Sequence, residues 1–319
     1  MKKVLASVLA AGALVGCASG PKETVRLNAA GATFPAPLYN SWFQTLAQQG
    51  GPEVNYQAVG SGSGVRQFNA GTTDFGASDK AVKDGNERPV VQIPMTGGAI
   101  VPAYNNPGCD LRVTQTQLAD IFLGNITTWE EVGCDGGIIT VVHRSDGSGT
   151  TAGFTASLSA FSEEWRTEVG SGKAVAWPTG VGGKGNSGVA GIIRNTEGAI
   201  GYLNYGYVNG GQFQQATIQN RDGNFVQANA ETSAAGLSQI VLDDQLRGSD
   251  PNPAGANSYP IVSLTWVLAH PEHEKNDTMK EVFGFMLSDE AQGVSDSLGY
   301  VPLPESIREQ AREVVETLT

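Results

Sequence analysis

The chain has 319 residues, with 40% hydrophobic and 16% charged side chains, and its formal net charge is −12 at pH 7. So acidic a protein is a poor candidate for binding nucleic acid or an anionic membrane surface. The length is sufficient for two domains.

The first 17 residues have the features of an export signal. Two lysines precede the apolar run Val4–Val15, which is too short to span a bilayer permanently. The Leu-Val-Gly-Cys sequence that ends at Cys17 resembles the lipobox of bacterial lipoproteins, and ordinary cleavage near Ala18 is the alternative. We therefore expect residues 1–17 to be a signal peptide with a lipobox, and Cys17 to anchor the protein to a membrane outside the cytoplasm. Loss of the two lysines takes the formal charge from −12 to −14.

Export also bears on the two remaining cysteines, Cys109 and Cys134. In an oxidising compartment such a pair favours a disulfide, and two buried free thiols are the alternative. Two cysteines without a nearby histidine do not make a convincing zinc site, so we expect no metal and no cofactor.

The first part of the chain alternates between strand and helix patterns. Residues 25–29 predict a strand, and apolar residues recur three and four apart after Thr33, which is a suitable N-cap for a helix. Residues 54–59 predict a second strand, which ends in the turn Gly60–Gly64 before a second helix. A third strand is expected over 73–78.

Two long apolar runs, 95–104 and 261–269, predict extended strands that cross between domains. Between them, a β-branched strand over 138–144 precedes a helix over 151–161, and the polar stretch 204–258 carries no clear pattern. The C-terminal tail predicts two or three helices. Strands that alternate with helices favour α/β domains with mainly parallel sheets.

Three strand-to-helix junctions offer hydroxyls and free main-chain N–H groups at the start of a helix. They are Thr33-Phe34, Gly60-Ser61-Gly62 and Ser148-Gly149-Thr150. In α/β sheets, ligands bind beyond the carboxyl ends of strands, so we expect these junctions to converge on an anion. Ordinary capping of the helix after Ser148 is the alternative for that junction.

Two charged side chains lie beside these junctions. Arg144 ends its strand with a planar cation that is suited to tetrahedral oxyanions, and Asp79 follows another strand as an acceptor. One cation, one carboxylate and many neutral donors describe a site for a small oxyanion that still carries a proton. Phosphate does so at neutral pH, whereas sulfate does not. The set contains neither a nucleophile–base pair nor metal ligands, so no turnover is expected.

Several segments together resemble a known family. Gly31–Pro37, Asp74–Asp79 and Arg144–Thr150 are similar to signature segments of the phosphate-binding proteins of bacterial phosphate ABC transporters, and 177–186 and 198–202 are similar too. The likeness covers nearly the whole chain after the signal peptide.

The resemblance implies a type II-like periplasmic-binding-protein fold with two hinged lobes. Each lobe would be a mainly parallel sheet flanked by helices, and two crossover strands would join them around the bound phosphate. Lobe I would comprise residues 25–98 and 259–319, and lobe II residues 99–258. Asp146 would brace Arg144. The implied phosphate-binding residues are Thr33, Phe34, Ser61, Asp79, Arg144, Ser148, Gly149 and Thr150.

The sequence departs from this family at three places. His143 stands where we expect Arg, and the second turn reads Gly-Ser-Gly-Ser-Gly where we expect two adjacent serines. The Cys109 and Cys134 pair is not a family feature. The second departure makes the role of Ser61 the least secure of the set.

We therefore expect a non-enzymatic, monomeric solute-binding lipoprotein of the periplasm or another extracytoplasmic space. It would capture inorganic phosphate and deliver it to a membrane permease and ATPase complex, with no nucleic-acid partner. Two alternatives stay open: a phosphate-sensing or phosphoester-processing surface protein, and a binding protein for another oxyanion.

Overall fold

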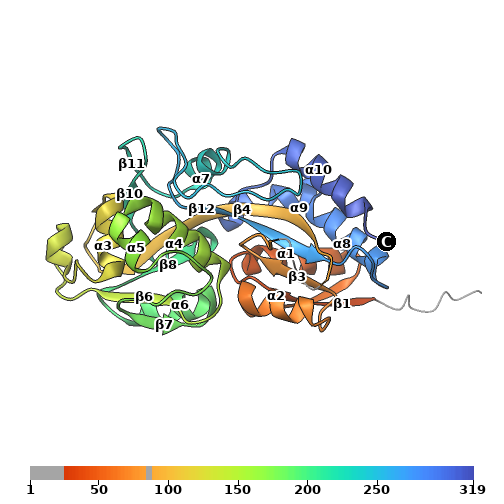
Figure 1. Ribbon diagram of the computed structural model, residues 1–319, viewed down its shortest axis with the longest axis horizontal. Helices are drawn as coiled ribbons and strands as arrows, with labels where there is room; N and C mark the ends of the chain where they lie inside the picture. The colour runs from red at the N-terminus through yellow and green to blue at the C-terminus, as the bar shows by residue number, and fades with distance from the viewer. Residues whose placement is uncertain (1–24, 84–87) are drawn as a thin grey trace, which may run out of the picture.

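The computed structural model describes residues 25–83 and 88–319, so the predicted signal peptide and Cys17 lie outside the described residues. In this part of the chain, no helix combines the length and the apolar character needed to cross a membrane. Two lobes lie side by side, and two long strands run through the middle of the molecule between them (Figure 1).

The crossing strands are β4 (Val91–Asn105) and β12 (Val262–Ala269). One lobe contains β1 (Arg26–Gly31), α1 (Ala36–Gln48), β2 (Glu53–Ala58), α2 (Ser61–Asn69), β3 (Phe75–Ser78), α8 (Asn276–Met286), α9 (Asp289–Gly293), η3 (Asp296–Leu298) and α10 (Glu305–Glu316). The other contains β5 (Arg112–Val113), α3 (Gln115–Leu123), η1 (Trp129–Val132), β6 (Thr140–Arg144), α4 (Gly149–Phe161), α5 (Glu163–Glu168), β7 (Val181–Gly183), α6 (Gly185–Asn195), β8 (Ala199–Asn204), η2 (Tyr205–Tyr207) and β9 (Gln214–Gln215). The segment that follows forms β10 (Thr217–Gln219), β11 (Phe225–Val226) and α7 (Ala230–Leu237).

One continuous sheet links the lobes in the order β2-β1-β3-β12-β4-β8-β6-β7, with β9 also beside β4. Within the lobes β1 pairs in parallel with β2 and β3, and β6 pairs in parallel with β7 and β8. The crossing strands pair antiparallel with their neighbours. The predicted α/β fold with two lobes and two crossover strands is confirmed.

The strand β4 changes its partner as it passes from one lobe to the other. Val91–Ala99 pairs with β12, and Ile100–Asn105 pairs with β8. This change supports the lobe boundaries drawn from the sequence, 25–98 with 259–319 and 99–258, which we retain as a proposal.

Burial explains why the crossing strands are recognisable in the sequence. Every residue of β12 is buried, and so is every residue of β4 except its two ends. A strand that is covered on both faces reads as a continuous apolar run rather than an alternating one. The polar stretch after β8 supplies β10 and β11, which form a small sheet with β5 in the order β11-β10-β5. It also supplies the helix α7, which packs on both crossing strands (Figure 1).

Three local features of the structure do not follow from the sequence analysis. Thr33 is not the N-cap of α1, because Pro35 takes that place without a side-chain hydrogen bond and the Thr33 hydroxyl is engaged elsewhere. The helix α2 begins at Ser61, inside the Gly-Ser segment rather than after it. The strand β7 has no strand pattern in the sequence, because two of its three residues are glycines.

The structure joins Cys109 and Cys134 in a disulfide, with Cα atoms 5.3 Å apart. The bridge encloses α3 and η1, on the lobe that contains β6. The main-chain oxygen of Cys109 also accepts hydrogen bonds from Tyr104 Oη (2.9 Å) and Gln214 Nε2 (2.8 Å). The bridge therefore attaches a helical excursion to the end of β4.

We predict that the Cys109→Ser/Cys134→Ser double variant is less stable than the wild type. The bridge spans a sequence separation of 25 residues, and a loop of that size is worth about 3 kcal/mol in the chain-entropy model. Urea unfolding followed by circular dichroism measures the difference. Dithiothreitol should lower the wild-type midpoint and leave that of the double variant unchanged. Equal midpoints for the two proteins without dithiothreitol would contradict the prediction.

Candidate anion-binding site

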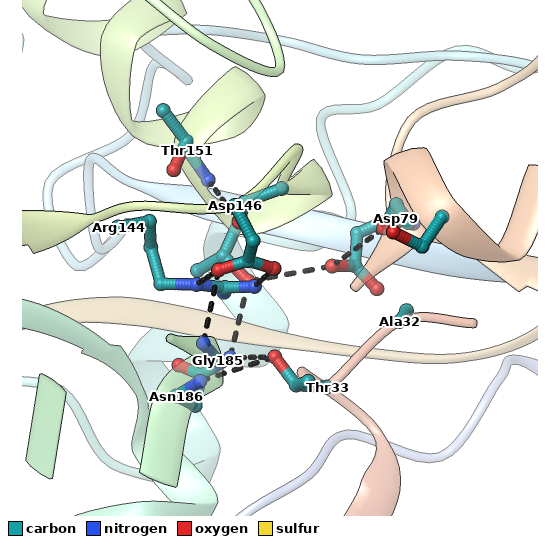
Figure 2. Close-up of polar contacts among 12 residues, drawn as sticks. Ala32, Thr33, Asp79, Arg144, Asp146, Thr151, Gly185 and Asn186 are labelled. Atoms are coloured by element: carbon teal, nitrogen blue, oxygen red, sulfur yellow. Dashed lines mark hydrogen bonds and ion pairs between the residues drawn. The ribbon is translucent and has the colours of Figure 1, made fainter. Parts of the chain in front are cut away.

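The three predicted junctions come together between the lobes. Figure 2 shows Arg144, Asp146 and Asn186 on one side of the site, with Thr33 and Asp79 facing them from the other lobe. The first side is built by the ends of β6 and β7 and the starts of α4 and α6. The facing side is built by the ends of β1 and β3 and the start of α2. Parallel strands end at a common edge of each sheet, which is why these segments meet.

Arg144 is the last residue of β6, and its side chain is 1% exposed. Its Nε and one Nη donate to the two carboxylate oxygens of Asp146, at 2.7 and 2.5 Å. The other amine nitrogen, Nη1, is buried and has no hydrogen-bond partner among the described residues. A buried guanidinium with one uncommitted edge is suited to bind an oxyanion.

Asp146 holds Arg144 in this orientation. Burial opposes the ionisation of Asp146, but the hydrogen bonds and charge of Arg144 outweigh it and lower the pKa of the carboxyl. The main-chain N–H of Gly185 also donates to Asp146 Oδ1 (2.9 Å), at the start of α6. The predicted bracing role of Asp146 therefore has the geometry that it requires.

Asp79 follows β3 and is 4% exposed. Its Oδ1 accepts from the Thr265 hydroxyl (2.9 Å), and its Oδ2 from the hydroxyls of Thr150 (3.3 Å) and Ser61 (3.5 Å). Burial raises the pKa of Asp79 to about 6, and the Thr265 hydrogen bond and the positive charge of Arg144 limit the rise. Three hydroxyls occupy the carboxylate, which has about four lone-pair sites, so one more donor can be accepted.

The start of α4 presents free donors to the same space. The Ser148 hydroxyl caps the helix by accepting from the main-chain N–H of Thr151 (3.0 Å), and the first N–H groups of a helix have no partner within it. At position 149 only glycine fits, because a Cβ atom there would lie 2.6 Å from both Asp79 Cβ and Ser61 Oγ. The close approach of the two lobes at Gly149 thus depends on the missing side chain.

The lobes are in direct contact around the site. The main-chain N–H of Gly62 donates to the oxygen of Gly147 (2.7 Å). The Thr33 hydroxyl accepts from the side chain of Asn186 (2.9 Å), and the Thr33 carbonyl accepts from Tyr207 Oη (2.7 Å). On the same loop, the Phe34 carbonyl accepts from Tyr300 Oη (2.8 Å). All eight predicted site residues are therefore gathered at one interface, and each of them is buried.

Sequence reasoning assigned no role to three residues that support the site. Asn186 lies in a glycine-rich segment, and Thr265 lies within the apolar run of β12. Tyr202 accepts from the main-chain N–H of Arg144 (3.1 Å) and shares a hydrogen bond with Thr151 (2.6 Å). The available signals were the family-like segments 177–186 and 198–202, which contain Asn186 and Tyr202, and a hydroxyl inside an apolar strand at Thr265.

His143 does not join the site through its side chain. Its ring stacks on Trp177 at 4.8 Å between centroids, and Trp177 stacks in turn on Tyr202 at 5.7 Å. His143 Nδ1 lies 3.1 Å from the carbonyl oxygen of Arg144, where the Nδ1–H tautomer can donate. The departure from the expected Arg therefore falls in the packing behind β6.

Comparison with known proteins shows which family the chain belongs to. A family model described as the PBP superfamily domain matches residues 18–290. In fold, the chain is similar to a putative phosphate ABC transporter substrate-binding protein from Clostridium perfringens, solved with bound phosphate (TM-score 0.68, 19% identity, 88% of this chain and 100% of that chain). It is also similar to the phosphate-binding protein from Stenotrophomonas maltophilia (TM-score 0.70, 19% identity, 91% and 94%).

Two relatives match more strongly in sequence. The Phosphate-binding protein PstS of Pasteurella multocida is 39% identical over 308 residues, which cover 88% of this chain and 87% of the relative. The protein of the same name from Haemophilus influenzae is 37% identical over 299 residues, with coverage of 88% and 90%. The chain belongs to the PBP superfamily and, within it, to the family of PstS phosphate-binding proteins.

Proposed function

We propose that this protein binds inorganic phosphate between its lobes and delivers it to an ABC transporter for uptake into the cell. The observation that carries the proposal is the buried Arg144 guanidinium, held by Asp146 with one nitrogen uncommitted and with Asp79 in the facing lobe. The surrounding hydroxyl and main-chain donors come from Thr33, Phe34, Ser61, Ser148, Gly149 and Thr150.

The opposed charges of Arg144 and Asp79 favour phosphate over other oxyanions. The cation binds the negative oxygens of the ligand, and the ionised carboxylate accepts the proton that phosphate keeps at neutral pH. Sulfate has no such proton, so its oxygen and Asp79 would face each other as two buried acceptors. Neither an oxyanion without a proton nor a phosphoester-processing activity gains support from this arrangement.

Binding between two lobes gives the transporter a state to recognise. Donors from both lobes reach one ligand only when the lobes are closed, so phosphate stabilises the closed form. The protein would act without turnover, as a monomer in the periplasm or another extracytoplasmic space. Names of relatives and of similar structures that refer to phosphate binding and ABC transport support this role.

We predict that Arg144→Ala weakens phosphate binding at least about tenfold. A hydrogen bond to a charged group contributes about 1.5–3 kcal/mol, and about 1.4 kcal/mol corresponds to a factor of ten. Calorimetric titration of the ligand-stripped protein gives the dissociation constant. Arg166→Ala, at an exposed ion pair with Glu163, is the matched control and should bind like the wild type. An unchanged constant for Arg144→Ala would place the site elsewhere.

We predict that Asp79→Asn raises the affinity for sulfate relative to phosphate by at least about tenfold, because the amide can donate to a sulfate oxygen. The wild type should approach this behaviour as the pH falls through about 6, where Asp79 gains a proton and becomes a donor. Above that pH it is ionised and rejects sulfate.

Titrations of both proteins with both anions between pH 5 and 8 make the comparison. The phosphate-to-sulfate ratio of Asp79→Asn should vary less with pH than that of the wild type. A ratio that the substitution leaves unchanged would show that Asp79 has no part in selectivity.

We also propose that Cys17 carries a lipid that holds the mature protein at a membrane. The lipobox-like sequence before Cys17 supports this, and a lipid anchor at the N-terminus leaves the binding domain free in the aqueous space. Mass spectrometry of the membrane-extracted protein should show an acylated N-terminal cysteine. An unmodified N-terminus at Ala18 or beyond would overturn the proposal.

A further inference from the structure

Asn186 is a fully buried amide at the start of α6, and it contacts both lobes. Its side-chain Nδ2 donates to the hydroxyl oxygen of Thr33 (2.9 Å) in one lobe and to that of Thr150 (3.3 Å) in the other. Its main-chain N–H also donates to Thr33 Oγ1 (3.2 Å). Its Oδ1 accepts from the main-chain N–H of Asn204 (3.1 Å).

The contact with Asn204 fixes which end of the amide faces the hydroxyls. A main-chain N–H can only donate, so the atom that it meets must be the amide oxygen. The NH₂ group of Asn186 must therefore point at Thr33, as Figure 2 shows, and at Thr150.

This orientation dictates the direction of both threonine hydroxyls. Thr33 Oγ1 accepts two hydrogen bonds from Asn186, which occupy its two lone pairs. In the described part of the chain, Thr33 donates its hydroxyl proton to no protein group. Thr150 accepts from Asn186 and gives its proton to Asp79 Oδ2 (3.3 Å).

We infer that Asn186 is a positioning residue that holds the Thr33 and Thr150 hydroxyls as donors and links the two lobes around the anion. The inference rests on the proposed function and adds a residue that acts on the ligand only through others. Thr33 is left with its proton to give to a ligand oxygen, and Thr150 keeps Asp79 hydrogen-bonded in its acceptor form. Because Thr33 and Asn186 belong to different lobes, their hydrogen bonds exist only when the lobes are closed.

A double-mutant cycle read by calorimetric titration with inorganic phosphate tests this coupling. Asn186→Ala should weaken binding about tenfold in the wild-type background and less than about threefold in a Thr33→Val background, because the amide acts largely through the hydroxyl that valine lacks. Asn195→Ala, at the exposed end of the same helix, is the matched control and should bind like the wild type. Equal factors in the two backgrounds would overturn the inference.

Asn186→Asp keeps the size of the side chain and provides a second test of the inference, which remains usable if Asn186→Ala does not fold. An ionised carboxylate at this position would accept from both threonine hydroxyls and turn their lone pairs toward the anion. Phosphate binding should fall at least about a hundredfold at pH 8 and recover toward pH 5 as the new carboxyl gains a proton.

The wild type titrated over the same pH range is the reference for Asn186→Asp, and parallel profiles of the two proteins would overturn the inference. Thermal melting of each variant shows that it is folded before the titration. A wild-type protein that binds no phosphate would overturn the proposed function and this inference together. Phosphate binding with an additive cycle would overturn this inference alone.

Discussion

The buried ion pair between Arg144 and Asp146 is the interaction on which the rest of the site depends. A guanidinium is removed from water only where carboxylates and hydrogen-bond acceptors replace its hydration. Asp146 occupies two of its nitrogens, and the main-chain N–H of Gly185 donates to Asp146 from the start of α6. The remaining edge of the cation is therefore fixed in direction before any ligand arrives, so binding costs little reorganisation.

The two crossing strands bring the second half of the site to this cation. Thr265 lies on β12, beside a register shift at Thr265/Trp266, and its hydroxyl donates to Asp79. A bulge of this kind can re-aim a side chain. The strand that joins the lobes thus also orients the carboxylate that faces Arg144, and the hinge and the site share a residue.

The sequence allowed the lobes and the charged pair to be predicted, because their signals are local. Buried crossing strands read as unbroken apolar runs. Arg144 ends a recognisable strand, and Asp79 directly follows another. Asn186 could not be recognised in the same way, since its partner Thr33 lies 153 residues away. The same distant contact explains why Thr33 is not the N-cap of α1. Its spacing from the helix suits an N-cap, but its hydroxyl is hydrogen-bonded to Asn186 in the other lobe. Glycines hid β7 for a related reason, as their small size serves packing rather than strand propensity.

The direction of hydrogen bonds, rather than net charge, explains how so acidic a protein can hold an anion. A formal charge of −12 repels phosphate at long range, so the attraction must come from groups in contact with it, where water and salt screen little. At this site the Arg144 guanidinium supplies buried positive charge. Asn186, Asp79 and Ser148 determine which hydroxyls and N–H groups can donate. A general positive field would attract sulfate as strongly as phosphate. A set of neutral donors with one acceptor, Asp79, distinguishes oxyanions by whether they carry a proton. The overall charge of the chain cannot make this distinction.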